Sequence, residues 1–151
     1  MPSETFQRSI SVAASPAHAW DVLTDVARVA SWVSIVEGLE ELERLSRYSA
    51  VLRDQVGPFR LHADLAVRVS DVREGETVTL SASGEDRHVG SRITIRATLT
   101  LSPSIDGTSV AVSGNYEVIG RVASLGSGTI RRKADKALEQ FFSNAQRELN
   151  A

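Results

Sequence analysis

The chain has 151 residues, a length typical of one domain with a single large hydrophobic core, and we expect residues 1–151 to form that domain. A net charge of -2 argues against nucleic-acid binding, and the absence of cysteine excludes disulfides, thiolate metal sites and a cysteine nucleophile. The N-terminal segment MPSETFQRSI has no cationic part before an apolar run, and no window of about 18 apolar residues occurs, so we expect a cytoplasmic protein without a signal peptide or transmembrane segment.

The first predicted elements are a strand and two short helices. Apolar residues alternate with polar ones over Thr5–Val12, as expected for a strand with one buried face. Ser15 and Pro16 then form a helix start, with a side-chain oxygen at the cap position and proline at the first helical position. Asp25 is placed to cap a second helix over Val26–Trp32, so the pattern predicts two helices rather than one.

The segment Leu39–Leu45 fits two kinds of secondary structure. Its leucines are three residues apart, which favours a helix, whereas the following residues alternate in polarity as far as Leu52, which favours a strand. The residue pattern alone does not choose between them. Gly57 and Pro58 mark a turn after this segment.

Four longer strands are predicted from residue 59 onward. Polarity alternates with a period of two in each of them, so each strand has one buried and one exposed face. They cover Phe59–Ser70, Thr77–Ser83, Arg92–Leu101 and Thr108–Ile119. Because short turns join them, they are expected to form an antiparallel meander.

The last predicted element is one long amphipathic helix over Gly120–Leu149, whose apolar stripe must cover the sheet. A twisted sheet curls, and a helix about 10 Å wide does not fill the resulting concavity. We therefore expect a cavity beside the smallest side chains, at Ala123–Thr129. The basic run Arg131–Lys133 falls on the polar face, where contact with water is favoured over contact with an acidic lipid or partner.

Three segments carry a resemblance to a known family: Pro16–Asp25, Val56–Phe59 (VGPF), and Gly120–Gly126 ahead of a helix that ends near Phe141 and Phe142. In these segments and in element order, the sequence resembles the START-like (SRPBCC, polyketide cyclase and Bet v 1-like) superfamily. Within that superfamily it is similar to the proteins known as the G subunit of carbon monoxide dehydrogenase. The resemblance implies an α+β helix-grip fold: a seven-stranded curved antiparallel sheet wrapped around a long C-terminal helix, with two short helices after the first strand. It also implies a strand for Leu39–Leu45.

The resemblance has functional implications as well. Members of this family bind hydrophobic ligands, so a lipid or an isoprenoid quinone is the implied ligand. The subgroup is associated with recruiting molybdenum-type carbon monoxide dehydrogenases and similar enzymes to the membrane. An oxidoreductase partner and peripheral contact with the inner membrane face are therefore implied too.

We predict a ligand site between the sheet and the C-terminal helix, because apolar cavities with a few orienting polar groups are typical of small-molecule sites. Tyr116 and Thr129 would supply hydrogen bonds to the ligand. The predicted lining residues are Trp32, Phe59, Tyr116, Val118, Leu125, Gly126 and Thr129.

A binding protein is favoured over an enzyme. His18, His62 and His88 occur singly, without the spacing of a metal site, so neither a metal nor another cofactor is predicted. The alternative is a polyketide cyclase-like or aromatase-like enzyme that uses the same cavity, with Tyr116 as its one attractive acid or base. A third role is a recruitment subunit that acts through its exposed face. Fold alone decides none of these.

Overall fold

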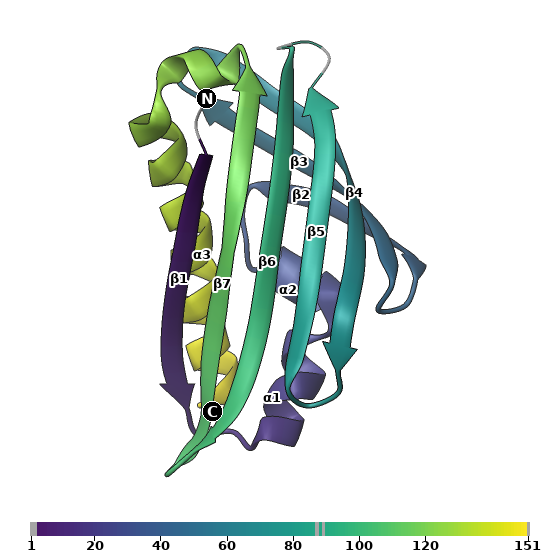
Figure 1. The fold of residues 1–151 in the computed structure, drawn as a ribbon, viewed down its shortest axis with the longest axis vertical. Coiled ribbons are helices and arrows are strands. Elements are labelled where there is room, and N and C mark those ends of the chain that lie inside the picture. Colours follow the sequence, from purple (N-terminus) through teal and green to yellow (C-terminus); the bar gives the residue numbers. More distant parts are fainter. Residues whose placement is uncertain (1–2, 87, 89, 151) are drawn as a thin grey trace.

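Seven strands form one antiparallel sheet in the part of the chain that the computed structural model describes, residues 3–86, 88 and 90–150. Two short helices follow the first strand and a long helix follows the last (Figure 1). The elements are β1 (Ser3–Val12), α1 (Pro16–Leu23), α2 (Val26–Ser31), β2 (Val36–Glu43), β3 (Arg47–Val56), β4 (Phe59–Arg73), β5 (Thr77–Asp86), β6 (Ser91–Ser104), β7 (Gly107–Gly120), η1 (Val122–Leu125) and α3 (Ser127–Leu149). The predicted helix-grip fold is confirmed.

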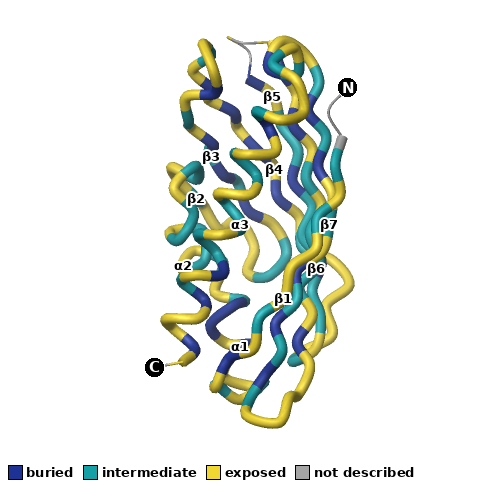
Figure 2. Tube along the Cα trace, turned by 90° about the vertical axis from the view of Figure 1, so that its left-hand side faces the viewer, coloured by how far each residue is buried: buried dark blue, intermediate teal, exposed yellow. Residues whose placement is uncertain are grey.

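The strand order is β1-β7-β6-β5-β4-β3-β2, so consecutive strands from β2 to β7 pair as a meander, as predicted. β1 pairs antiparallel with β7, in a register that runs from Ser3 opposite Glu117 to Val12 opposite Thr108. The sheet curls around α3, and Figure 2 shows the helix between the β2–β3 end and the β1–β7 end of the sheet. One face of the sheet therefore turns towards the helix.

The two short helices begin where the capping residues predicted them. The Ser15 side chain accepts a hydrogen bond from the His18 backbone N–H at 3.3 Å, and Pro16 is the first residue of α1. The Asp25 carboxylate accepts one from the Arg28 N–H at 3.3 Å and caps α2. These side-chain oxygens satisfy N–H groups that have no partner within the first turn of a helix.

The ambiguous segment is a strand, as the family resemblance implied. β2 ends at Glu43, and Leu45 lies in the following turn with a φ of 53°. The register of β2 against β3 shifts between Glu41 and Glu43, and this irregularity breaks the period of two. Leu42 is left 54% exposed on the edge strand, so the helix-like spacing of the leucines does not reflect a helix.

The C-terminal helix is shorter than predicted. The expectation of one helix from Gly120 is wrong, because β7 continues to Gly120, the short helix η1 follows, and α3 begins only at Ser127. Gly120 and Gly126 have φ values of 96° and 86°, a conformation that glycine adopts without strain. The glycines of this segment therefore turn the chain twice between the sheet and α3.

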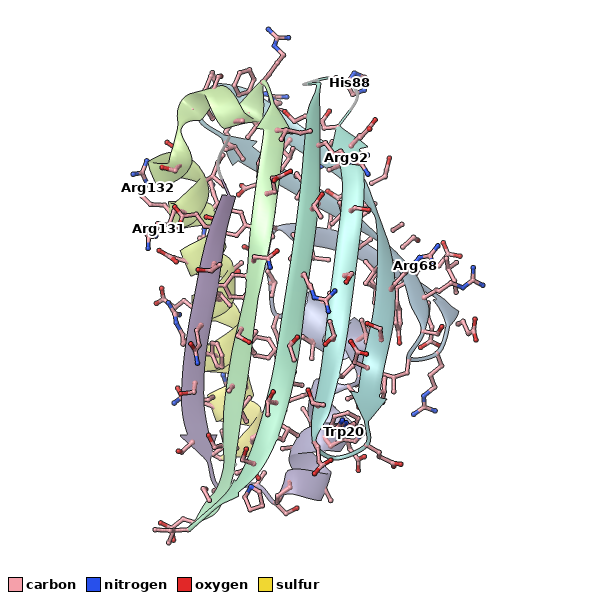
Figure 3. The ribbon with its side chains drawn as sticks, viewed as in Figure 1. Trp20, Arg68, His88, Arg92, Arg131 and Arg132 are labelled. Carbon is pink, nitrogen blue, oxygen red and sulfur yellow. The ribbon has the colours of Figure 1, made fainter. Side chains whose placement is uncertain are left out.

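The core consists of two clusters that lie towards opposite ends of α3. One joins the start of α3, at Ile130, to inward residues of β3, β4 and β7. The other joins its end, at Phe142, Ala145 and Leu149, to α1 and to β1, β6 and β7, and includes Trp20 (Figure 3). The Ala14 N–H also donates to the Leu149 carbonyl at 2.9 Å and ties the end of α3 to the loop after β1. The middle of α3 is thus held between two packed regions.

Candidate functional site

A cavity of about 420 Å³ lies between the inward face of the sheet and the middle of α3. Almost all of its lining side chains are aliphatic or aromatic, and the polar ones are Thr24, Tyr116 and Lys133. The sheet contributes Phe6, Val36, Leu52, Val56, Leu61, Val69, Val78, Leu80, Ile93, Ile95, Ala97, Leu99, Val112, Tyr116 and Val118. The helices and connecting segments contribute Leu23, Thr24, Val26, Val29, Val33, Ile35, Leu45, Val122, Ile130, Lys133, Ala134, Ala137, Leu138 and Phe141.

The cavity exists because α3 presents small side chains to the sheet in its middle. Ala134 and Ala137 line it there, between Ile130 on one side and Phe141 on the other. On the sheet, inward side chains such as Leu80 and Ile95 are only partly buried. Apolar surface that faces an unfilled space forgoes the packing contacts of a normal core.

The predicted position of the cavity, Ala123–Thr129, is therefore wrong. Small side chains of the helix do line the cavity, but these are Ala134 and Ala137, one to two helical turns further along the chain. The glycine-rich segment lies at the corner between β7 and α3, where Gly126, Ser127 and Gly128 are exposed to solvent.

Tyr116 is the polar residue of greatest interest in the lining. Its position on β7, opposite Glu4 of β1 and Ile95 of β6, directs the side chain inward, and the residue is only 8% exposed. Within the described residues its hydroxyl is buried and has no hydrogen-bond partner. Most buried side-chain polar atoms in proteins do have a partner, so this hydroxyl requires an explanation.

The environment of Tyr116 raises the pKa of its hydroxyl above the ordinary value of 10.0. Burial is the largest cause, because it penalises the charged form, and the negative charges of Glu4 and Asp135 act in the same direction. Arg131 lowers the pKa and offsets part of this effect. The hydroxyl is therefore protonated at neutral pH and available as a hydrogen-bond donor.

Two polar pairs connect α3 to elements on the other side of the cavity. Lys133 lines the cavity, and its Nζ lies 2.9 Å from Asp54 Oδ2 of β3. The expectation that Lys133 belongs to the solvated face of the helix is thus wrong, because its side chain is only 32% exposed. Further along α3, Gln140 Oε1 accepts a hydrogen bond from the Ser34 N–H at 2.9 Å, in the loop between α2 and β2.

Of the predicted site residues, Tyr116 and Val118 line the cavity, because both lie on the inward face of β7. Trp32 packs instead against Phe141, with ring centroids 5.9 Å apart, in the cluster around the end of α3. Phe59 lies beneath the guanidinium of Arg121, 5.9 Å from its ring centroid, outside the lining.

The remaining predicted residues lie at the corner before α3 and do not belong to the lining. Leu125 covers the turn at Gly57, where an added Cβ would lie 3.0 Å from its side chain. Gly126 is exposed, and Thr129 accepts a hydrogen bond from Arg132 at 3.3 Å. For these residues, contact with a ligand stays a prediction.

The lining residues that sequence reasoning missed are mainly Ala134, Ala137 and Leu138 on α3 and the inward residues of β5 and β6. The strand residues were identified as buried from their alternation, but as core rather than cavity. The two alanines, three residues apart within a stripe of larger side chains, were the available signal for the position of the cavity.

A second, polar cleft lies on the outward side of β3 and β4 and includes His62 and His88. His62 Nδ1 is 3.1 Å from Arg53 Nη2, and Arg53 also forms an ion pair with Glu37 at 2.9 Å. Among the described residues there is no group of three or more metal-ligating side chains.

One protein-family model matches nearly the whole chain. The model of the CoxG family, the G subunit of carbon monoxide dehydrogenase, matches residues 9–150. The chain belongs to this family. The match includes every residue of the cavity lining of this CoxG family member except Phe6 of β1. The resemblance noted in the sequence is confirmed.

Solved structures agree with this assignment at the level of the fold. A conserved protein from Geobacillus kaustophilus is 21% identical, with a TM-score of 0.83 over 97% of this chain and 95% of its own. A START superfamily protein from Mycobacterium smegmatis is 14% identical, with a TM-score of 0.68 over 96% of each chain. The di-domain ARO/CYC StfQ from the steffimycin biosynthetic pathway is 12% identical, with a TM-score of 0.66. The match covers 98% of this chain and 50% of StfQ.

These solved structures show that the CoxG family member has the fold of the START superfamily protein. No curated protein matches the chain. Among the described residues, no helix has the length and apolar character needed to cross a bilayer.

Proposed function

We propose that this protein binds a hydrophobic small molecule, a lipid or an isoprenoid quinone, in the cavity between the sheet and α3. The observation that carries the proposal is the apolar lining of a space of about 420 Å³. This volume lies within the range of about 300–1,000 Å³ that is typical of small-molecule sites. The few polar groups among many apolar ones also match such sites.

The physical reason is that neither water nor the protein's own side chains fill this space favourably. A water molecule in a cavity needs two to four polar partners, and the aliphatic lining offers almost none. A hydrocarbon ligand removes apolar surface from water on both sides of the contact, worth about 25 cal/mol per Å². Binding of an apolar ligand is the favourable outcome.

The biological role that we propose is that of an accessory or recruitment subunit for an oxidoreductase of the carbon monoxide dehydrogenase kind, at the inner face of the membrane. Support comes from membership of the CoxG family, which is named as a subunit of that enzyme. A carrier that shields a quinone or lipid from water suits such a role, because these ligands are poorly soluble outside the membrane.

A polyketide cyclase-like or aromatase-like enzyme is the second candidate. The observation in its favour is the likeness to one half of an ARO/CYC protein, together with a protonated Tyr116 hydroxyl in the cavity. General acid catalysis requires such a group within reach of the substrate. Turnover of a polyketide substrate that is lost in Tyr116→Phe would favour this candidate over the binding protein.

Native mass spectrometry of the purified full-length protein tests the main proposal, with identification of the bound molecule in an organic extract. We expect a bound lipid or quinone, and uptake of the apolar fluorescent probe diphenylhexatriene after delipidation. Filling the cavity with Ala137→Phe should prevent both. A wild-type protein that carries no ligand and takes up no probe would overturn the proposal.

A further inference from the structure

We propose that the cavity selects a neutral ligand with a hydrogen-bond acceptor, such as a ketone, quinone or ester carbonyl, and that Tyr116 donates the hydrogen bond that positions this oxygen. The inference rests on the proposed function and specifies its ligand class. It distinguishes carbonyl compounds both from pure hydrocarbons and from carboxylates of the same chain length.

In the described part of the chain, the Tyr116 hydroxyl lacks the hydrogen-bond partner that a buried hydroxyl normally has. It is buried at the wall of an apolar cavity and, within the described residues, donates to no atom and accepts from none. The chain's other tyrosine shows the usual arrangement, because the Tyr48 hydroxyl accepts a hydrogen bond from the Leu45 N–H at 2.7 Å. A buried hydroxyl without a partner is costly, and a ligand acceptor would remove that cost.

The other polar side chains of the lining, Thr24 and Lys133, already have partners within the protein. Thr24 Oγ1 donates to the Trp20 carbonyl at 2.6 Å, as is common for a threonine in a helix. Lys133 Nζ forms its ion pair with Asp54 at 2.9 Å. Because the Lys133 side chain is a third exposed, its remaining N–H donors are open to water, whereas the Tyr116 hydroxyl is buried and, among the described lining residues, is the donor that has no partner. One donor matches one acceptor oxygen on an otherwise apolar molecule.

The charges around Tyr116 disfavour an anionic ligand. The burial that disfavours ionisation of Tyr116 also disfavours a carboxylate or phosphate placed beside it. Glu4 and Asp135 add negative potential at this hydroxyl, and each raises its pKa by more than Arg131 lowers it. No cation of the described lining is free to compensate a ligand anion, because Lys133 is paired. A neutral acceptor is therefore favoured.

A matched set of ligands tests the inference: 2-tridecanone, tridecane and tridecanoate, each measured by displacement of diphenylhexatriene from the delipidated full-length protein. We expect the ketone to bind about five to ten times more tightly than the alkane, the magnitude of one hydrogen bond, and the carboxylate to bind more weakly than the ketone. Tyr116→Phe should abolish the preference for the ketone and leave alkane binding unchanged.

Tyr48→Phe is the matched control, because Tyr48 is not among the lining residues and its hydroxyl already bonds to the backbone N–H of Leu45. It should leave the ketone preference intact. A ketone that binds no better than the alkane, or a preference that survives Tyr116→Phe, would overturn the role of Tyr116. A carboxylate that binds most tightly would overturn the selection for neutral ligands. If none of the three ligands displaces the probe and the probe itself does not bind, the proposed function fails as well.

Discussion

Lys133 of α3 and Asp54 of β3 form an ion pair with 2.9 Å between Nζ and Oδ2, beside a cavity that the stem of the lysine helps to line. Two helical turns further on, Gln140 makes its hydrogen bonds to Ser34. Lys133, Ala137 and Gln140 follow one another at helical spacing, so the two polar pairs flank the small side chain of Ala137 on the same side of α3. These polar pairs tie this side of the helix to β3 and to the α2–β2 loop, in addition to the core contacts of Ile130 and Phe141.

Lys133→Met should accelerate both uptake and release of diphenylhexatriene while changing the free energy of unfolding by less than about 1 kcal/mol. The methionine keeps the apolar stem but loses the attraction to Asp54, which is worth little in stability because both side chains are about a third exposed. Stopped-flow fluorescence measures the rates. Lys136→Met, on the exposed face of α3, is the control and should leave them unchanged. Equal rates in all three proteins would show that the ion pair does not limit access.

Ala137→Phe should weaken the binding of apolar ligands by more than about tenfold, because the ring occupies space that a ligand needs. Titration with diphenylhexatriene measures this. Gly126→Trp is the matched test of the glycine-rich corner. Its Cβ would point into open space, outside the cavity lining, so we expect uptake to be unchanged although the φ of 86° introduces strain. Loss of uptake in Gly126→Trp alone would place the ligand at that corner.

Gly114→Ala should destabilise the fold by about 1–3 kcal/mol, the usual cost of forcing extra atoms into a packed region. A Cβ at this position on β7 would lie 2.0 Å from the Arg96 carbonyl oxygen and 2.8 Å from the Phe6 ring. Gly38→Ala on the edge strand β2 is the control, since nothing lies within 4 Å of its Cβ. Urea denaturation compares the two variants, and equal midpoints would contradict the contact geometry at Gly114.

Tyr116 should make the stability of the protein fall at high pH. Its pKa is raised in the folded state above the ordinary value of 10.0, so as the pH rises past 10.0 the unfolded chain releases the proton first. The contribution of protonated Tyr116 to the free energy of unfolding is fully present below pH 10.0. It is lost progressively as the pH rises towards the folded-state pKa. Urea denaturation between pH 9 and 11 should show a steeper decline for wild type than for Tyr116→Phe. Parallel declines would contradict the raised pKa.

Tyr116→Phe should also leave the stability of the ligand-free protein at neutral pH unchanged or slightly higher. The substitution removes a buried hydroxyl that has no partner in the described structure, so no hydrogen bond is lost. Tyr48→Phe should instead lower the free energy of unfolding by about 1 kcal/mol, because it removes the hydrogen bond to the part-buried N–H of Leu45. Thermal unfolding of the delipidated variants measures both. A marked destabilisation by Tyr116→Phe would show that the hydroxyl has an acceptor within the fold.

Local features of the fold were predictable from the sequence because their causes are local. Alternation along β4 to β7 follows from the opposite directions of successive side chains in a strand. The capping oxygens of Ser15 and Asp25 act within one helical turn, and α1 and α2 begin where these residues predict. The family, and with it the assignment of β2 as a strand, required the resemblance as well.

The position of the cavity depended on contacts between residues far apart in the sequence. Whether Ala137 faces solvent, a packed core or an empty space is decided by the curvature of the sheet opposite, to which β2 to β7 all contribute. The pairing of Lys133 with Asp54 likewise joins residues that no local pattern relates. The strands, the caps and the amphipathic helix follow from interactions within a few residues, so the amino-acid order was enough to predict them. Two features depend on the distances between elements after they pack: the position of the cavity between α3 and the sheet, and the lack of a partner for the Tyr116 hydroxyl among the described residues. They therefore became known only from the folded arrangement.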